Sequence, residues 1–304
     1  MYYFVYGLLY TLSLLPMVVL YLLSDFIYLL LYYVFGYRRK IVRMNLGIAF
    51  PEKTSEDRLK IERQFYKNFV DNFIETLKLF SGKDKFALRH FHTDPTLMQE
   101  LYDKGLKCQF HLGHNFNWEL ANIAVSVMTK YTFLGVYMPL DNKLFDRIFR
   151  KMRSATGTVL LPANNMKAAM IPYRNTLYLL GLVADQVPGD VSRAYWMNFF
   201  GRPTPFVRGP EKGAVAANLA VVFAQIYKTR RGHYHLDYEV CTENPAELAP
   251  GEITRRYVKY LEAGIRKYPD MWLWSHRRWK REWKEEYRDL WTDEAPMPGG
   301  SGAE

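Results

Sequence analysis

Short apolar runs alternate with helical patterns through most of this 304-residue chain. The clearest run, Leu177 to Val183, is apolar throughout, which is typical of a strand buried on both faces of a parallel sheet. The alternation predicts an α/β fold with a mixed, largely parallel central sheet flanked by helices. The predicted strands cover 106–110, 131–137, 159–161, 177–183, 225–227 and 233–241, and the predicted helices cover 54–80, 120–128, 141–155, 164–174, 209–224 and 252–268.

The N-terminal segment predicts a membrane-anchoring helix. Met1 to Ser24 contains no charged residue, and as a helix it would extend about 36 Å, enough to cross a bilayer core. No small-residue cleavage site ends the run, so we expect a retained anchor and not a removed signal peptide. Pro16 and Asp25 interrupt the run, so a single span and a kinked, hairpin-like insertion both stay open. We therefore expect an anchor at 1–36, an α/β domain at 37–295 and a flexible tail at 296–304.

The charge distribution favours a cytoplasmic protein body with anionic partners. A basic cluster from Arg38 to Arg43 follows the apolar segment, which predicts that the body lies on the cytoplasmic side. The net charge of +10, from 41 Lys and Arg against 31 Asp and Glu, suits phospholipid surfaces, phosphorylated substrates, acidic proteins or nucleic acid. Only two cysteines, Cys108 and Cys241, are present, so we expect a reducing compartment and not a disulfide framework.

A predicted strand-to-helix turn carries the most suggestive side chains. His111-Leu-Gly-His-Asn-Phe-Asn-Trp-Glu119 joins strand 106–110 to helix 120–128, a position where open α/β sheets commonly bind ligands. Five residues of helix turn through about 500°, so His114 and Glu119 can meet only if His114 lies in the turn itself. In that arrangement His114 is a candidate general base, and Glu119 orients its other ring nitrogen. The alternative is a capping histidine beside a glutamate that the helix dipole favours.

Other polar side chains also lie at predicted element ends. Asp185 and Gln186 directly follow strand 177–183, so we expect them at the same carboxyl edge as the His111 turn. Arg153 lies near the end of helix 141–155, where the helix dipole alone would favour a cation. The stretch from Pro269 to Trp283 holds four Trp among basic residues. It predicts a membrane-interface belt or, less consistently with an anchor, a nucleic-acid stacking surface.

These segments together resemble the lipid A biosynthesis acyltransferases (Kdo-dependent, lauroyl/myristoyl type) of the lysophospholipid acyltransferase superfamily. Gly113-His-Asn-Phe-Asn-Trp-Glu119 resembles the family's histidine-x4-acid motif, with Asn115-Phe116 where Phe-Gly is usual. The similarity covers almost the whole chain, and its motifs are specific when taken together. The further matching segments are Tyr37-Arg-Arg, Asn45 to Lys53, Tyr137 to Asn142, Met152-Arg-Ser154, Ala184-Asp-Gln186, Asn198 to Thr204 and Trp272 to Lys280.

The resemblance implies a bacterial inner-membrane enzyme that moves a fatty acyl group from acyl carrier protein to a hydroxyl of a lipid A precursor. It implies no metal or nucleotide cofactor, and its expected partners are acyl carrier protein, the acceptor lipid and membrane lipids, without nucleic acid. Two alternatives stay open: acylation of another polar lipid (an aminolipid, lysophospholipid or glycolipid), or lipid binding without catalysis. The implied catalytic residues are His114 and Glu119, and the implied supporting or substrate-binding residues are Arg153, Asp185, Gln186 and Asn142.

Overall fold

A seven-stranded sheet forms the centre of the computed structural model, which describes residues 1–298. Its strand order is β1-β9-β8-β2-β5-β3-β4, and every neighbouring pair is parallel except β8 with β9. The predicted α/β class with a largely parallel sheet is therefore confirmed. The strands are β1 Phe91–Thr93, β2 Cys108–Leu112, β3 Thr132–Tyr137, β4 Val159–Pro162, β5 Tyr178–Val183, β8 Ala220–Arg230 and β9 His233–Thr242.

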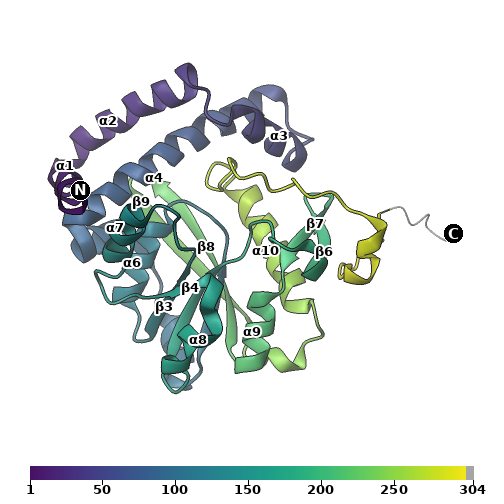
Figure 1. Ribbon diagram of the computed structural model, residues 1–304. Helices are drawn as coiled ribbons and strands as arrows, with labels where there is room; N and C mark the ends of the chain where they lie inside the picture. Colours follow the sequence, from purple (N-terminus) through teal and green to yellow (C-terminus); the bar gives the residue numbers. More distant parts are fainter. Residues whose placement is uncertain (299–304) are drawn as a thin grey trace.

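Helices cover both faces of this sheet. Helices α6 (Trp118–Met128) and α7 (Lys143–Arg153) lie on one side, and α9 (Gly209–Ala217) and α10 (Glu252–Lys267) lie on the other (Figure 1). The predicted helix 164–174 is a short helix, α8 (Met166–Met170), between two 3-10 turns. A separate hairpin, β6 (Ala194–Phe199) and β7 (Arg202–Val207), was not predicted. The remaining helices are α3 Arg39–Ala49, α4 Ser55–His90 with a kink at Lys83, and α5 Thr96–Asp103.

The predicted helix 209–224 is wrong in its second half. Helix α9 ends at Ala217, and Asn218 then adopts a left-handed conformation (φ 46°) of the kind that terminates helices. Ala220 to Ala224 instead form the start of β8, fully buried between β2 and β9. An Ala-rich segment favours a helix by propensity, but here the backbone pairing of a central strand overrides it.

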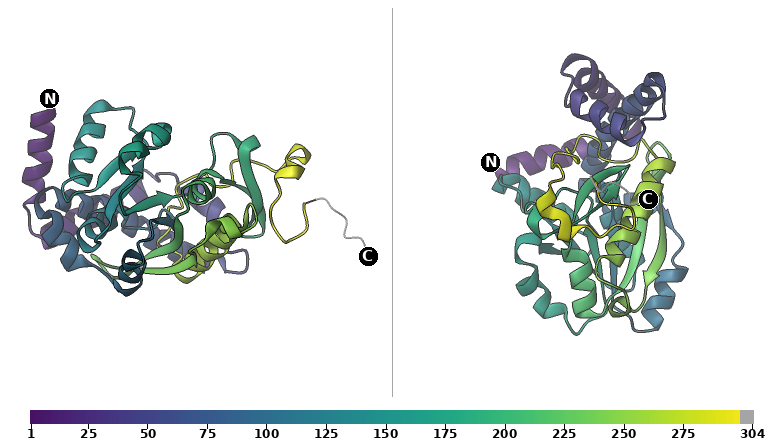
Figure 2. Two further views of the ribbon diagram at one scale, coloured as in Figure 1. Left: turned by 90° about the horizontal axis from the view of Figure 1, so that it is seen from below. Right: turned by 90° about the vertical axis from the view of Figure 1, so that its right-hand side faces the viewer.

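The uncharged N-terminal run is not one continuous helix. It forms α1 (Tyr2–Ser13) and α2 (Met17–Leu29), which a π-helical turn extends through Val34. The break falls at Pro16, because proline lacks the amide hydrogen and clashes with the preceding turn. The segment long and apolar enough to cross a membrane is therefore Met17–Val34, of which 22% is buried, and not 1–24. In both views of Figure 2 the purple N-terminal helices lie at an outer edge of the molecule.

Polar contacts hold α2 along α4. Ser24 Oγ donates to Asp71 at 2.7 Å, and Tyr21 Oη donates to Glu75 at 3.0 Å. Arg231, in the turn between β8 and β9, lies 2.7 Å from both Asp25 and Asp71. Helix α2 is thus tied to the α/β body by side-chain hydrogen bonds and ion pairs, although its outer face is apolar and exposed.

Part of the basic cluster that follows the N-terminal helices is used inside the molecule. Arg39 Nε and Arg43 Nε lie 3.2 Å and 2.8 Å from the carboxylate of Glu62, which is 2% exposed. Arg38 donates to the carbonyl of Ser275 at 3.1 Å. These residues therefore join α3 to α4 and to the C-terminal segment, as well as carrying positive charge near the N-terminal helices. Residues 299–304 of the predicted flexible tail lie outside the described part of the chain.

Candidate active site

The predicted strand-to-helix turn is present, between the end of β2 and the start of α6. His111 belongs to β2 and is 1% exposed, and burial lowers its pKa to about 3, so it is neutral and enclosed. His114 lies in the turn, and 22% of its side chain is exposed. Gly113 permits a close approach here, since a Cβ on it would lie 2.6 Å from Leu261 and 3.2 Å from Asp185 Oδ2.

Asp185 is the carboxylate that holds His114. Its Oδ1 lies 2.5 Å from His114 Nδ1, and its Oδ2 accepts from the His114 amide at 2.7 Å. Trp272 Nε1 also donates to Oδ2, at 2.6 Å. Burial disfavours the charge of this carboxylate, but the contacts with His114 and Trp272 outweigh burial and lower its pKa to about 2. Asp185 is therefore an ionised side chain that fixes the imidazole ring from its Nδ1 side.

The predicted contact between Glu119 and His114 is wrong in this structure. Glu119 lies in the first turn of α6, and its carboxylate accepts from Arg153, with Nε to Oε2 at 2.8 Å and Nη2 to Oε1 closer still. Trp118 Nε1 also donates to it, at 3.2 Å. A two-point, charge-assisted pair with a guanidinium is stronger than a single hydrogen bond to an imidazole. This difference explains why Glu119 pairs with Arg153 and not with His114. Arg153 is the last residue of α7, so the pair joins the ends of α6 and α7.

Gln186 lies at the sheet edge where its place after β5 predicted it, and there it is beside the second ring nitrogen of His114. Its side-chain Nε2 is 3.1 Å from His114 Nε2, so the amide donates to that nitrogen when Nδ1 carries the ring proton. Asn142 has a different place. Its side chain caps α7 by accepting from the amides of Leu144 at 3.0 Å and Phe145 at 3.3 Å. Its substrate-binding role stays a prediction.

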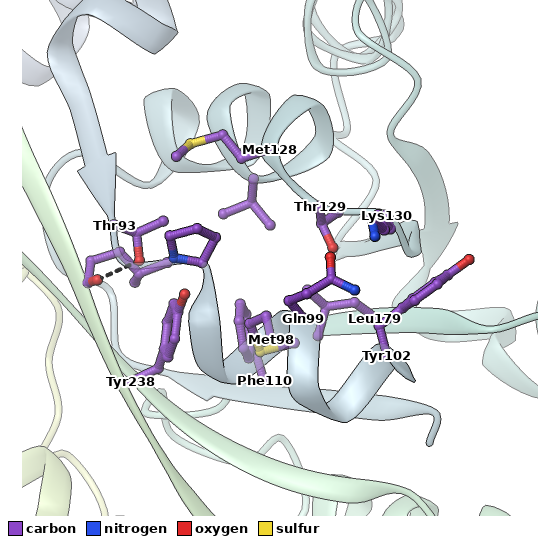
Figure 3. Close-up of a pocket in the computed structure, with 13 residues that line it drawn as sticks. Thr93, Met98, Gln99, Tyr102, Phe110, Met128, Thr129, Lys130, Leu179 and Tyr238 are labelled. Atoms are coloured by element: carbon purple, nitrogen blue, oxygen red, sulfur yellow. Dashed lines mark hydrogen bonds between the residues drawn. The ribbon is translucent and has the colours of Figure 1, made fainter. Parts of the chain in front are cut away.

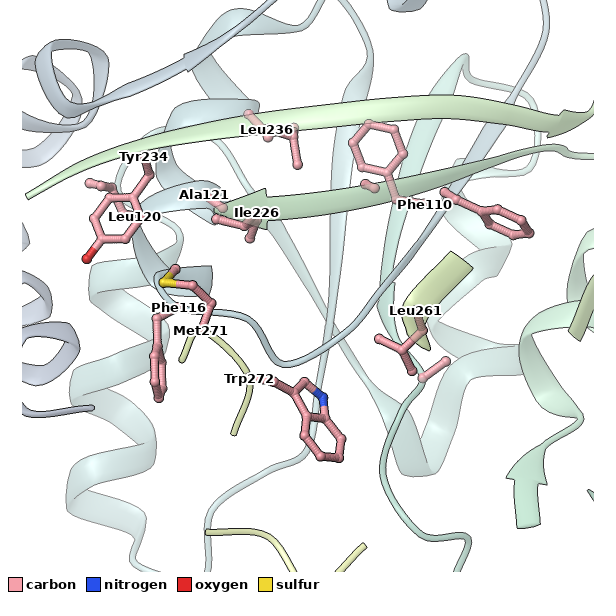
Figure 4. Packing of buried hydrophobic residues seen from close by; sticks show 14 of the residues in the cluster. Phe110, Phe116, Leu120, Ala121, Ile226, Tyr234, Leu236, Leu261, Met271 and Trp272 are labelled. Atoms are coloured by element: carbon pink, nitrogen blue, oxygen red, sulfur yellow. The ribbon is translucent and has the colours of Figure 1, made fainter. Parts of the chain in front are cut away.

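The C-terminal tryptophan segment braces the turn from the far side. The amide of Phe116 donates to the Met271 carbonyl at 3.0 Å, and the amide of Leu273 donates to the His114 carbonyl at 3.1 Å. Figure 4 shows Phe116, Met271 and Trp272 close together beneath the sheet. Trp272 and Trp274 are 1% and 0% exposed, so the predicted interface belt is wrong for these two residues. They are part of the core that supports the site.

A buried glutamate on α4 supports the middle of the turn. Asn117 caps α6 by accepting from the Leu120 amide at 3.1 Å, and its Nδ2 donates to Glu75 Oε2 at 3.0 Å. Glu75 also accepts from Tyr234 at 2.7 Å. Burial raises its pKa to about 7, against these hydrogen bonds. Sequence reasoning overlooked Glu75; its signal was a charge between Ile74 and Leu77 on the apolar stripe of the helix.

A cavity of about 380 Å³ opens beside these groups. Its polar end is lined by His114, Glu119, Arg153 and Gln186, and the rest of the lining is mostly apolar. Such a cavity can hold an aliphatic group with its reactive end beside the histidine. His114 Nε2 can take a proton there, while Asp185 stabilises the imidazolium that forms. Within residues 1–298 no three His, Cys, Asp or Glu side chains gather as metal ligands, and the expectation of no cofactor stays a prediction.

The chain matches the model of a known protein family. The family model described as bacterial lipid A biosynthesis acyltransferase matches residues 1–281 of the 304. No curated protein matches the chain. The matched region includes the N-terminal helices, the whole sheet, the turn with His114 and the tryptophan segment through Lys280. The predicted family is confirmed, and the chain belongs to the bacterial lipid A biosynthesis acyltransferases.

Proposed function

We propose that this protein transfers a fatty acyl chain from the thioester of acyl carrier protein to a hydroxyl of a lipid A precursor. The observation that carries the proposal is the placement of His114. Its Nδ1 is bound by Asp185, and its Nε2 lies at the polar end of a largely apolar cavity. Family membership supports an acyltransferase that acts in lipid A biosynthesis.

In the proposed step, His114 is the general base. The acceptor hydroxyl displaces the amide of Gln186 from His114 Nε2 and transfers its proton to that nitrogen as its oxygen attacks the thioester carbon. The carbon–sulfur bond then breaks, and the leaving thiolate takes the proton back from the imidazolium. An ester and a free thiol result, so atoms and charge balance without an enzyme-bound acyl intermediate. Asp185 holds the ring orientation and stabilises its transient positive charge.

Glu119 and Arg153 have a different part in this proposal. Because the Arg153 guanidinium binds the carboxylate of Glu119, this carboxylate is not free to act as a strong base at the start of the reaction. They form a polar wall beside His114 and fix the end of α7 to the start of α6, which shapes the cavity. We therefore assign them substrate positioning, with proton transfer left to His114.

The net charge and the exposed apolar surface support the proposed donor and location. A net charge of +10 favours acidic acyl carrier protein, whose association should weaken as salt screens it over about 10 Å at 0.1 M. The exposed apolar faces of α1 and α2 include Tyr3, Phe4 and Leu22, which are 66–82% exposed. We propose that these faces enter the cytoplasmic side of the inner membrane, where the acyl carrier protein and the lipid precursor both have access.

The proposal can be tested with purified full-length protein in detergent–lipid micelles. The assay supplies acyl carrier protein thioester or acyl-coenzyme A as donor, and lipid A precursor, lysophospholipid or an aminolipid as acceptor. The expected result is one added acyl chain on the lipid A precursor by mass spectrometry, faster with the carrier protein and slower at high salt. Equal use of coenzyme A at a salt-independent rate contradicts the donor, and acylation of only another lipid contradicts the acceptor.

A further inference from the structure

A second cavity lies beyond the apolar end of the active-site cavity. Its apolar end is lined by Phe110, Val125 and Leu236, and the same three side chains also line a second, smaller cavity of about 50 Å³. The far wall of that second cavity includes Met98 and other residues from the region of α5 and β9 (Figure 3). The three shared residues therefore form a waist between two hollow spaces. Figure 4 shows Phe110 and Leu236, which lie on β2 and β9 with β8 between them.

Strand register places the two cavities in line on one face of the sheet. Strands β2 and β5 are parallel, with Leu112 opposite Val183, Phe110 opposite Gly181 and Cys108 opposite Leu179. Alternate residues of a strand point to the same face. Val183 and Gly181 line the active-site cavity, whereas Leu179 lines the second one. From Val183 to Leu179 the strand covers about 13 Å, so a straight groove runs from the catalytic edge into the body.

Two glycines keep this groove open. Gly181 of β5 and Gly135 of β3 are register partners, and both line the active-site cavity. A Cβ on Gly181 would lie 3.2 Å from the Phe133 ring, and one on Gly135 would lie 3.2 Å from Asn122 Oδ1. Neither glycine has a positive φ, so backbone conformation does not require them. The missing side chains instead make room between the sheet and α6.

We propose that this groove holds the transferred acyl chain and that the waist of Phe110, Val125 and Leu236 stops its methyl end, so these three side chains set the chain length. This inference rests on the proposed function. The polar end of the groove suits the polar thioester group. The apolar remainder of the groove suits the hydrocarbon chain. A chain longer than the preferred one would have to push through the waist into the second cavity.

Opposed variants test the waist. Val125→Ala removes two methyl groups from it and should join the two cavities, while Gly181→Ala should push the Phe133 ring into the groove. One methylene in an apolar pocket typically changes discrimination by roughly 10–200-fold. We therefore expect Val125→Ala to raise the ratio of the next longer even-numbered chain to the preferred chain about tenfold. We expect Gly181→Ala to shift the preference to shorter chains. The matched control is Val258→Ala, a buried valine on α10 against the other face of the sheet.

The measurement is native mass spectrometry of full-length protein incubated with an equimolar series of straight-chain saturated fatty acids, followed by acyl transfer with the matching mixture of donors. A shift to longer bound chains in Val125→Ala, to shorter ones in Gly181→Ala and none in Val258→Ala supports the inference. An unchanged distribution in both folded groove variants overturns it, as does an equal shift in the control. If the bound lengths shift as expected but no lipid A precursor is acylated, the groove assignment stands and the proposed function fails.

Discussion

Two hydrogen-bonded side-chain pairs lie at the same edge of the sheet, and they differ in which atoms can still meet a substrate. In the His114–Asp185 pair the carboxylate binds one ring nitrogen, and the other nitrogen meets only the side-chain amide of Gln186, which also lines the cavity. In the Glu119–Arg153 pair the guanidinium meets both carboxylate oxygens. The first arrangement suits proton transfer and the second suits holding two helices together. Closeness in sequence misleads here: His114 and Glu119 are five residues apart, yet Asp185, 71 residues away, holds the histidine.

The largest effect should come from removing the base. His114→Ala should lower kcat by roughly 10²–10⁴-fold, because no other group takes the hydroxyl proton. The matched control is His235→Ala on β9, a histidine whose side chain is 31% exposed and which lies outside the cavity lining in the described chain. Steady-state kinetics with a saturating donor measure both variants. Near-normal turnover of His114→Ala would show that proton transfer does not depend on this pair.

Asp185→Asn should have the next largest effect, a loss on the order of 10²-fold in kcat, because an amide can hold the wrong ring tautomer and stabilises the imidazolium less. The KM for the acceptor should change little if Asp185 acts through His114. A raised KM with unchanged kcat would instead make Asp185 a binding residue.

Glu119→Gln sharpens the comparison, because it should act mainly on structure and substrate position. The remaining Arg153 would lose its charge partner while only 21% exposed. We expect lower thermal stability, a higher KM, and a coupling energy of roughly 1–3 kcal/mol with Arg153→Gln in a double-mutant cycle. A loss of kcat as deep as that of His114→Ala, at unchanged stability, would return Glu119 to the proton-transfer step.

Glu75 affects stability and not catalysis, and it contrasts with Asp185, since burial raises its pKa to about 7. Between its ordinary pKa of 4.5 and 7, the folded protein keeps a proton that the unfolded chain releases, so folding stability falls as pH rises. The full loss is about 3 kcal/mol and is complete above about pH 7. Glu75→Gln, neutral at every pH, should lack this component. Denaturation of both proteins from about pH 4.5 to about pH 8 measures how the free energy of unfolding changes with pH. The same pH dependence in both proteins would contradict the raised pKa of Glu75.

The sequence predicted those parts of the molecule that follow from local pattern. The run at 177–183 correctly placed a buried strand, and Asp185 and Gln186 therefore came to the edge of the His111 turn. Strand β7 was missed because Pro203 and Pro205 are unusual in strands, and they occur here in a two-stranded hairpin.

The partners of the site residues could not be predicted in the same way. Which carboxylate meets His114 depends on β5 lying next to β2, a pairing across 71 residues that no local pattern encodes. The same holds for Trp272, whose indole reaches Asp185 across 87 residues. Tryptophans among basic residues also resemble a membrane-interface belt, and only the tertiary packing distinguishes the two.

The tautomer of His114 tests the central claim most directly. Nitrogen-15 NMR of the histidine-labelled protein near pH 8 reports which ring nitrogen carries the proton. We predict a protonated Nδ1 bound to Asp185 and an unprotonated Nε2, a pattern that Asp185→Asn abolishes and Glu119→Gln leaves unchanged. A proton on Nε2, or a signal that responds to Glu119→Gln and not to Asp185→Asn, would contradict the account.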